Sequence, residues 1–402
     1  MTLPEVAEPT RATNTPPDLT QLTSLRFVAA LAVLVLHYRD FLGPLPGWVM
    51  RGIVGGQYGV TFFFILSGFI LTYRYHGWFD AGVGDAAFWR FQRLRAARLY
   101  PVYLFGLLLD TPWHLIERAQ VGELAAVGTT YWASWLLNAV GLQAWVPAVP
   151  FAMFWNTPAW SVSAEFFFYA SFPFMVHGLG RRLRSTAGLV LGFVLAVCGG
   201  IALYAAVIYT MTYVVAVGAE AQYIVLVYNP VLRFSEFVAG SLAGWYFVRT
   251  RHELGGLRHR AASLGSARNV VVAAALVAIA ARVWMPDYTG PDRWVWLLDV
   301  SVKYGSFVLP FTALILAVAS GRTVLSGLLC RPWMVTLGES SYALYIVHWS
   351  GVTILRMGYF GEKPSLAVVA LCLFGTVGVS MLCHRWIEVP WRAKLRGSSA
   401  SS

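Results

Sequence analysis

The chain has 402 residues, of which 58% are hydrophobic and only 12% are charged. A soluble globular domain is about 25% charged, so this composition excludes an ordinary water-soluble protein. Lipid requires that backbone polar groups are paired internally, and the long apolar runs therefore predict an all-α integral membrane protein. We attribute the net charge of +11 to lysines and arginines in cytoplasmic loops, and we expect no nucleic-acid partner.

Ten apolar runs are long enough to cross a lipid bilayer as helices. A further run at 127–146 is more polar and lies between two arginine clusters, which the positive-inside rule places in the cytoplasm. The two runs beside it already form a pair of crossings, so we expect 127–146 to be interfacial or re-entrant. The predicted crossings are 24–42, 55–74, 99–117, 156–179, 187–209, 230–248, 269–285, 301–320, 336–356 and 366–386.

This pattern predicts ten transmembrane helices with both termini in the cytoplasm, because most of the 30 lysines and arginines then lie on that side. We expect a disordered cytosolic tail at 1–20, a transmembrane domain at 21–392 and a disordered tail at 393–402. The 4 cysteines have no metal-ligand spacing, so we predict neither a disulfide nor a metal site.

Arg26 and His37 lie in the first apolar run, eleven positions apart. Both side chains therefore point to the same side of a helix, about 16 Å apart along its axis. Ionisable groups inside a membrane helix are costly and usually serve a function. The alternative is an arginine that snorkels to the membrane surface and a histidine that only bonds a neighbouring helix.

The fourth run carries Glu165, and Thr157 before Pro158 predicts an N-cap at the start of its helix. Glu165 then lies about 10 Å into the helix, in the same half of the membrane as His37. A carboxylate beside an imidazole fixes its tautomer, so we predict that Glu165 orients His37. The alternative is that the carboxylate of Glu165 only forms hydrogen bonds with neighbours on its helix.

Arg95 and Arg98 precede the third run and are three positions apart, on one helix face. Arginine can hold a phosphate through two parallel hydrogen bonds, so this pair suits a phosphorylated cofactor or substrate. An interfacial helix held by anionic lipid is the alternative.

Other polar residues of the apolar runs are predicted to be structural. Arg233 and Glu236 are three positions apart and are expected to form an internal ion pair. Asp110 and His114 are expected near the outer end of the third crossing, where water solvates them, and no role is assigned to them. Ser67 has no sign of an activating base and is expected to serve helix packing.

Five segments together resemble the bacterial acyltransferase-3 family of integral membrane acyltransferases. The resemblance extends from about residue 20 to 392, and a sixth segment, Ile387–Pro390, is similar to the usual end of the family domain. It implies a multi-pass protein of the plasma (inner) membrane. The five segments are 22–37, 59–69, 95–101, 160–169 and 341–348.

The resemblance implies an O-acyltransferase with acyl-CoA as donor substrate and no bound cofactor. The implied acceptor is a hydroxyl of a sugar, a cell-envelope glycan or a natural product. Arg26 and His37 match the family's arginine–histidine pair, and Arg95 and Arg98 match its Arg-x-x-Arg pair. Many members carry Asp where Thr61 stands, so any role of that carboxylate is absent here.

We therefore expect Arg26, Arg95 and Arg98 to bind the phosphates of acyl-CoA. His37 is expected to act as a general base with Glu165 beside it, while transient transfer of the acyl group to His37 remains open. The expected acceptor-lining residues are Trp160, Ser163, Tyr345 and His348, and a structural role for His348 is equally compatible.

The alternative function is a transporter or flippase of a lipid-linked or secreted small molecule. Polar residues inside a helix bundle suit that function equally well. No internal repeat stands out in the sequence, which argues against it.

Overall fold

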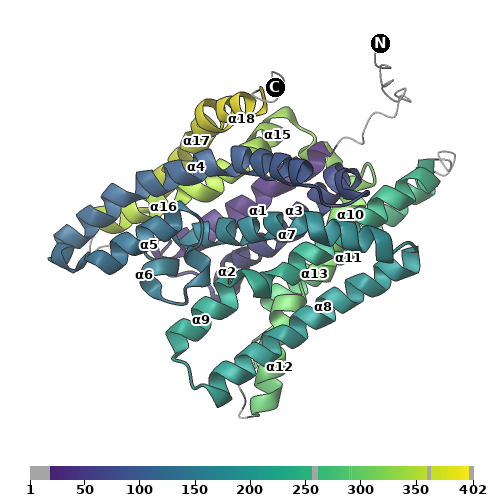
Figure 1. Cartoon of the computed structure of the whole chain (residues 1–402). Coiled ribbons are helices and arrows are strands. Elements are labelled where there is room, and N and C mark those ends of the chain that lie inside the picture. The colour runs from purple at the N-terminus through teal and green to yellow at the C-terminus, as the bar shows by residue number, and fades with distance from the viewer. Residues whose placement is uncertain (1–18, 256–260, 289, 291, 360–363, 398–402) are drawn as a thin grey trace.

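The computed structural model describes residues 19–255, 261–288, 290, 292–359 and 364–397. Every regular element within these ranges is helical, as the composition predicts (Figure 1). The long helices are α1 (Thr20–Tyr38), α3 (Gly59–Tyr75), α4 (Asp85–Gln120), α7 (Trp160–Arg182), α8 (Thr186–Tyr209), α10 (Pro230–Gly255), α11 (Ala261–Trp284), α16 (Ser341–Gly358) and α17 (Leu366–Cys383).

Shorter helices complete the bundle, and the pattern of apolar runs did not predict them as separate elements. They are α2 (Gly47–Val54), α5 (Thr129–Ala139), α6 (Val149–Ala152), α9 (Ala219–Tyr228), α12 (Arg293–Gly305), α13 (Val308–Ala319), α14 (Ser326–Leu329), α15 (Pro332–Glu339) and α18 (Val389–Gly397). The predicted tail at 1–20 lies almost wholly outside the described residues, and α18 extends to Gly397, within the tail predicted at 393–402.

Six helical stretches of the described residues are long and apolar enough to cross a membrane. The other four predicted crossings correspond to α4, α7, α10 and the pair α15–α16, whose buried charged and polar side chains lower their hydropathy. The chain is therefore a multi-pass membrane protein. The six stretches are Thr20–Phe41, Gly47–Phe79, Thr186–Val214, Gly265–Trp284, Trp294–Ala319 and Leu366–Lys394.

The segment at 127–146 contains α5, which has only 11 residues. A helix of that length spans about 16 Å, roughly half of the hydrocarbon thickness of a bilayer. This segment therefore holds no helix that could cross a membrane, in agreement with the prediction.

The start of α7 differs from its prediction. The helix begins at Trp160, after a 3-10 turn at Thr157–Ala159. The hydroxyl of Thr157 donates to the carbonyl oxygen of Met153 at 2.6 Å, so it does not accept from the first turn of α7. The predicted N-cap is therefore wrong, because the turn preceding the helix uses this side chain instead.

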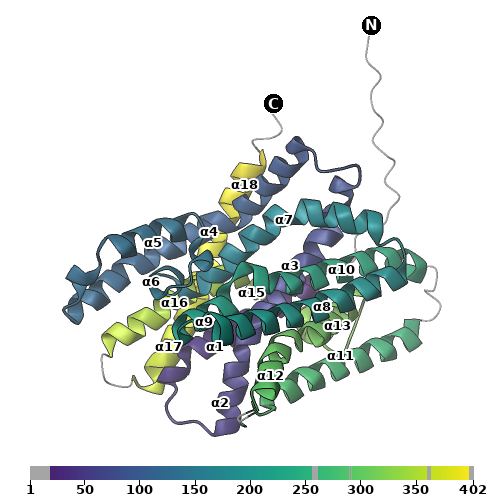
Figure 2. The same cartoon turned by 60° about the horizontal axis from the view of Figure 1, so that its bottom comes forward.

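The centre of the bundle is formed by α1, which packs against α3, α13, α15 and α16. Figures 1 and 2 both show α5 and α6 at one side of the molecule and α11 at the opposite side. We call the end of α1 that carries Arg26 the arginine end and the end that carries His37 the histidine end.

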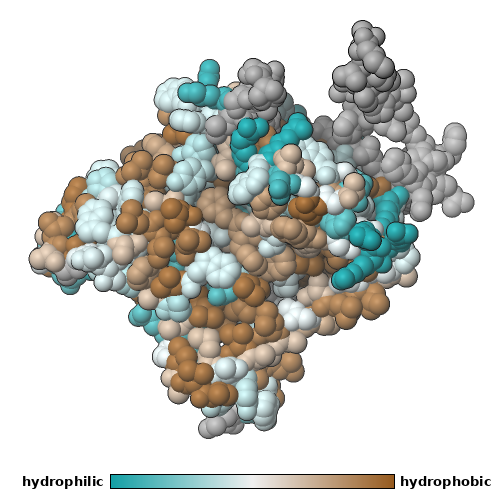
Figure 3. Space-filling model, in the orientation of Figure 1, coloured by the Kyte–Doolittle hydropathy of each residue, from teal (hydrophilic) through white to brown (hydrophobic). Residues whose placement is uncertain are grey.

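The surface of the bundle fits a lipid environment. Figure 3 shows apolar side chains over much of the visible face, with hydrophilic side chains gathered toward its upper and right edges. Large exposed hydrophobic residues recur along the outer helices, where lipid can cover them. Examples from α8 and α11 are Leu191, Leu195, Val270 and Val277.

Candidate functional site

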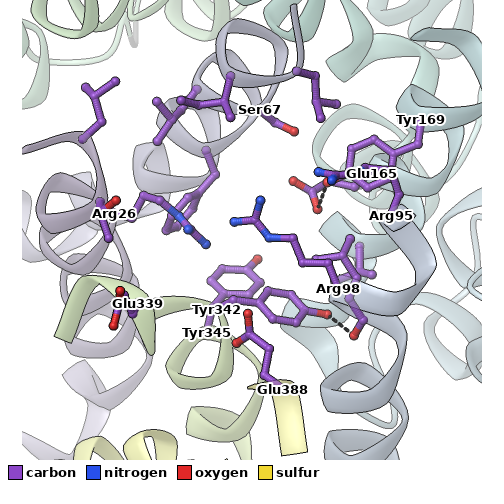
Figure 4. A pocket seen from close by; sticks show the side chains of 18 of the residues that line it. Arg26, Ser67, Arg95, Arg98, Glu165, Tyr169, Glu339, Tyr342, Tyr345 and Glu388 are labelled. Carbon is purple, nitrogen blue, oxygen red and sulfur yellow. Dashed lines mark hydrogen bonds between the residues drawn. The ribbon is translucent and has the colours of Figure 1, made fainter. Parts of the chain in front are cut away.

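A cavity of about 550 Å³ opens among α1, α3, α4, α7, α16 and the C-terminal segment (Figure 4). Ligand-binding pockets in proteins typically measure about 300–1,000 Å³, so the cavity is large enough for part of a cofactor-sized molecule. Charged side chains dominate the polar part of its wall. They are Arg26, Arg74, Arg95, Arg98, Arg392, Glu165, Glu339, Glu388 and His384.

Three of these arginines were predicted to share a site, and the structure brings them together. Arg26 comes from α1, whereas Arg95 and Arg98 come from α4, and all three line the cavity. Figure 4 shows the guanidinium of Arg98 extending into the cavity toward Arg26. Several cations facing one enclosed space are suited to a ligand with phosphate groups.

Arg95 is the most firmly held of the three, with only 4% of its surface exposed. Its Nη2 donates to the hydroxyl of Tyr75 at 2.7 Å, and its guanidinium lies 4.9 Å from the centre of the same ring. The ring of Phe91 lies 5.8 Å away on α4. The Nε of Arg95 is buried and has no hydrogen-bond partner within the part of the chain that the structure describes.

Glu165 lies in this cavity and not beside His37. Its Oε2 accepts a hydrogen bond from the Tyr169 hydroxyl at 3.0 Å, one helical turn further along α7. In Figure 4 the carboxylate faces the space occupied by the arginines. The predicted contact between Glu165 and His37 is therefore wrong, because Glu165 lies among the arginines of the cavity and His37 is not part of the cavity wall.

His37 instead forms a pair with His348 of α16. The Nδ1 of His37 lies 2.9 Å from the carbonyl oxygen of Val33 and 3.0 Å from the Nε2 of His348. The Nδ1 of His348 lies 3.3 Å from the carbonyl oxygen of Leu344. His348 is fully buried within the bundle.

These contacts determine the neutral tautomers of the pair. A carbonyl oxygen only accepts hydrogen bonds, so the Nδ1 of each ring carries the proton. The Nε2 of His348 then accepts from the Nδ1–H of His37. The Nε2 of His37 is left without a proton, as a general base requires.

The histidine pair lies next to the cavity but does not form its wall. The ring centre of Tyr345 is 5.9 Å from that of His348, and Tyr345 does line the cavity. The Tyr345 hydroxyl donates to the carbonyl oxygen of Pro158 at 2.9 Å. On the other side of the pair, the ring of Trp349 meets His37 edge to face at 5.3 Å.

Two of the predicted acceptor-lining residues are part of the packed core. Trp160 is buried and stacks on Tyr228, with ring centres 5.0 Å apart. Ser163 is also buried, and its hydroxyl has no hydrogen-bond partner. Neither residue contributes to the cavity wall, so only Tyr345 of the four predicted residues lines it.

The predicted ion pair of α10 is confirmed. The Nη2 of Arg233 lies 3.0 Å from the Oε2 of Glu236, and both side chains are buried. Thr61 of α3 connects them, since its hydroxyl donates to Glu236 and accepts from Arg233. The pair thus fastens α10 to α3 within the bundle.

Asp110 and His114 are not solvated, contrary to the prediction. Asp110 is 0% exposed and accepts hydrogen bonds from Asn156 and Ser350. His114 is also buried, and its Nε2 lies 2.6 Å from the carbonyl oxygen of Trp155. The residues before α7 and the side chains of α16 cover this part of α4, which the apolar pattern does not reveal.

Tyr169 and Glu388 belong to the site, although sequence reasoning gave them no role. Tyr169 follows Glu165 by one helical turn, and that spacing was the available signal. Glu388 accepts from Arg392 at 3.4 Å and lies 3.0 Å from the Nδ1 of His384. It stands in the segment that resembles the end of the family domain, and this segment reaches the cavity.

Comparison with known proteins supports an enzyme of acyl transfer. A family described as the acyltransferase domain, acyltransferase 3, matches residues 19–385. The chain is 32% identical over 161 residues to acyltransferase MdmB of Streptomyces mycarofaciens, which covers 39% of this chain and 38% of that protein. It is 35% identical over 88 residues to protein 2 in the picA locus of Rhizobium radiobacter, covering 22% and 41%.

The aligned part thus spans about two fifths of each of these two relatives. No solved structure matches the chain. The family match is far longer than either alignment, since it includes Arg26, Arg95 and Arg98, the histidine pair and all of α1 to α17. The chain therefore belongs to the acyltransferase-3 family.

Proposed function

We propose that this membrane acyltransferase moves an acyl group from acyl-CoA to a hydroxyl of a sugar, a cell-envelope glycan or a natural product. The observation that carries the proposal is the arrangement of the cavity, with three arginines on its wall and a histidine pair beyond Tyr345. The arginines suit a donor with phosphate groups, and the histidine pair suits an acceptor hydroxyl that must lose its proton.

We place the protein in the plasma (inner) membrane with ten crossings and with both termini and the arginine end in the cytoplasm. Acyl-CoA is then available at the mouth of the cavity. The high share of lysine and arginine in the segments of this side supports the orientation.

In this proposal the donor binds with its phosphates at the arginine end. Arg95 offers its free Nε, and Arg26 and Arg98 face the same space. Charge-assisted hydrogen bonds of this kind contribute about 1.5–3 kcal/mol each. The pantetheine arm then points along α1 toward Tyr345 and brings the thioester to the histidine end.

His37 acts as the general base through its Nε2. It takes the proton of the acceptor hydroxyl while the hydroxyl oxygen attacks the thioester carbonyl carbon. The carbon–sulfur bond breaks, an ester forms, and the CoA thiolate receives the proton from the imidazolium. Attack of the same nitrogen on the thioester, with an acyl-histidine intermediate, is the alternative route.

His348 takes over the positioning role that the sequence assigned to Glu165. Its Nε2 accepts from the Nδ1–H of His37 and so favours the tautomer with a free Nε2. Glu165 is a counter-ion that aligns the arginines of the cavity and partly balances their charge before the donor binds.

The test is release of CoA thiol by the purified full-length protein in detergent. Acetyl-CoA is mixed with a cell-envelope extract, and the free thiol is measured with and without the extract. We expect extract-dependent release by the wild type and release slower by about 10²–10⁴-fold by His37→Gln. Absence of release by a folded wild-type protein, together with uptake of a lipid-linked or secreted solute in vesicles, would favour the transporter alternative.

A further inference from the structure

Two aromatic rings, Phe63 and Tyr345, stand in the cavity wall toward the histidine pair, which is itself not part of the wall. Along α3, Val60, Phe63, Ser67, Ile70 and Arg74 all line the cavity. They recur at helical spacing and therefore share one face of the helix. Val60 and Phe63 are the members of this series nearest to the histidine end, and the ring of Phe63 meets the ring of Tyr345 edge to face at 5.8 Å.

The two rings differ in how firmly they are held. Tyr345 is buried, and its hydroxyl is tied to the carbonyl oxygen of Pro158 at 2.9 Å. Phe63 has no polar anchor and is only partly buried. Rotation of the Phe63 side chain is therefore the smaller change that could connect the cavity with His348 and His37.

We propose that Phe63 determines which acyl chains the enzyme accepts. Its ring, packed against Tyr345, fills part of the cavity toward the histidine end, so that only short acyl groups fit beside it. The inference rests on the proposed function, because it assumes that the thioester must reach His37. It assigns short acyl groups, of acetyl size, as the preferred donors.

The physical basis is the low tolerance of packed pockets for extra volume. One methylene more or less in an apolar pocket changes the selectivity of an enzyme by about 10–200-fold. Removing the aromatic ring of Phe63 from the cavity frees the volume of several methylene groups. A variant that lacks the ring should therefore accept longer chains.

The experiment compares Phe63→Ala and Phe63→Leu with the wild type, using acetyl-, butyryl-, hexanoyl- and octanoyl-CoA. CoA thiol release gives kcat/KM for each donor. In Phe63→Ala we expect the ratio of hexanoyl to acetyl transfer to rise by about tenfold or more. Phe63→Leu, which keeps part of the volume, should give an intermediate ratio.

Ile70→Ala is the matched control, because Ile70 lines the cavity on the same face about 10 Å nearer the arginine end. It should change the rates with all donors by one common factor. A hexanoyl-to-acetyl ratio that stays at the wild-type value in Phe63→Ala would overturn the inference. An equal shift in Ile70→Ala would overturn it too, since general widening would then explain the change.

The outcome separates the two proposals. Transfer by the wild type with an unchanged ratio in folded Phe63→Ala leaves the proposed function standing and removes the role of Phe63. Absence of transfer by the wild type with every donor removes both. Thermal unfolding and acetyl-CoA binding of each variant establish that it is folded.

Discussion

The two ring nitrogens of His37 have different environments, and this difference decides what the residue can do. Nδ1 is engaged by Val33 and His348, whereas Nε2 is left to accept a proton. An ionisable side chain is costly to place inside a membrane, so a histidine in a membrane helix is a functional candidate from the sequence alone. Its partner across 311 positions of the chain is visible only in the folded molecule.

Replacing His37 by Gln keeps a polar side chain of similar reach but removes the base. We expect the transfer rate to fall by about 10²–10⁴-fold, the usual contribution of general acid–base catalysis. Acetyl-CoA affinity, measured by calorimetry on the purified protein, should remain near the wild-type value. A loss of affinity as large as that of Arg26→Ala would assign His37 to the donor site.

His348 should behave as a positioning residue. In His348→Ala the Nδ1–H of His37 loses one of its two acceptors, so we expect slower transfer and a shifted pH profile with unchanged acetyl-CoA affinity. His348→Gln retains a side-chain oxygen that can accept the same hydrogen bond, and it should recover part of the rate. Equal rates for the two variants, both folded, would contradict the tautomer argument.

At the scale of helices, close approach of α3 and α10 decides how the bundle packs. A Cβ on Gly68 would meet the carbonyl oxygen of Phe237 at 2.1 Å, and one on Gly240 would meet that of Ile65 at 2.0 Å. Small residues at such a crossing let two backbones touch, which is the main source of helix association in lipid.

Gly68→Ala should therefore destabilise the protein, although alanine favours helices in general. Overpacking typically costs about 1–3 kcal/mol, which exceeds the gain of about 0.5–1 kcal/mol from replacing glycine. Gly378→Ala in α17 is the control, because its Cβ meets nothing within 4 Å. Thermal unfolding in detergent should show a lower midpoint for Gly68→Ala only. Equal midpoints would mean that the crossing can relax.

The arginine pair of α4 gives a prediction for donor binding. Replacing both Arg95 and Arg98 by Ala should weaken acetyl-CoA binding by several kcal/mol at most, because each charge-assisted contact contributes about 1.5–3 kcal/mol. Arg98→Lys should restore only part of the affinity, since an ammonium cannot form the two parallel hydrogen bonds of a guanidinium. Unchanged affinity in the double variant would leave these residues with a lipid-anchoring role.

At the scale of the whole molecule, the orientation in the membrane determines which substrate reaches which end. Arg26 and the proposed base, His37, lie toward opposite ends of α1, about 16 Å apart along its axis. If the arginine end faces the cytoplasm, acyl-CoA and an extracytoplasmic acceptor can approach the reaction centre from opposite sides.

A cysteine-labelling experiment tests this orientation. In a variant without the four native cysteines, Glu123→Cys lies between α4 and α5, and Arg184→Cys lies between α7 and α8. Both positions are exposed. A membrane-impermeant thiol reagent should label position 123 in intact cells and position 184 only after lysis. Labelling of position 184 in intact cells would invert the proposed topology.

Much of the architecture follows from local features of the sequence. Composition and apolar runs determine that the protein is a helical membrane protein, because lipid leaves few ways to pair the backbone. Helical spacing also places Arg95 beside Arg98 and Arg233 beside Glu236, since both pairs lie within one turn. The segments that resemble the acyltransferase-3 family, taken in order, then predict acyl transfer, which the family match supports.

The contacts between helices depend on how the bundle packs. Helical spacing gives the depth and the face of each side chain, but the identity of its neighbour depends on which helix lies alongside. For this reason Glu165 could be assigned to His37 although it lies among the arginines of the cavity, while Asp110 could be taken for a solvated group. The pairing of His37 with His348 and the contact of Phe63 with Tyr345 arise from long-range packing alone.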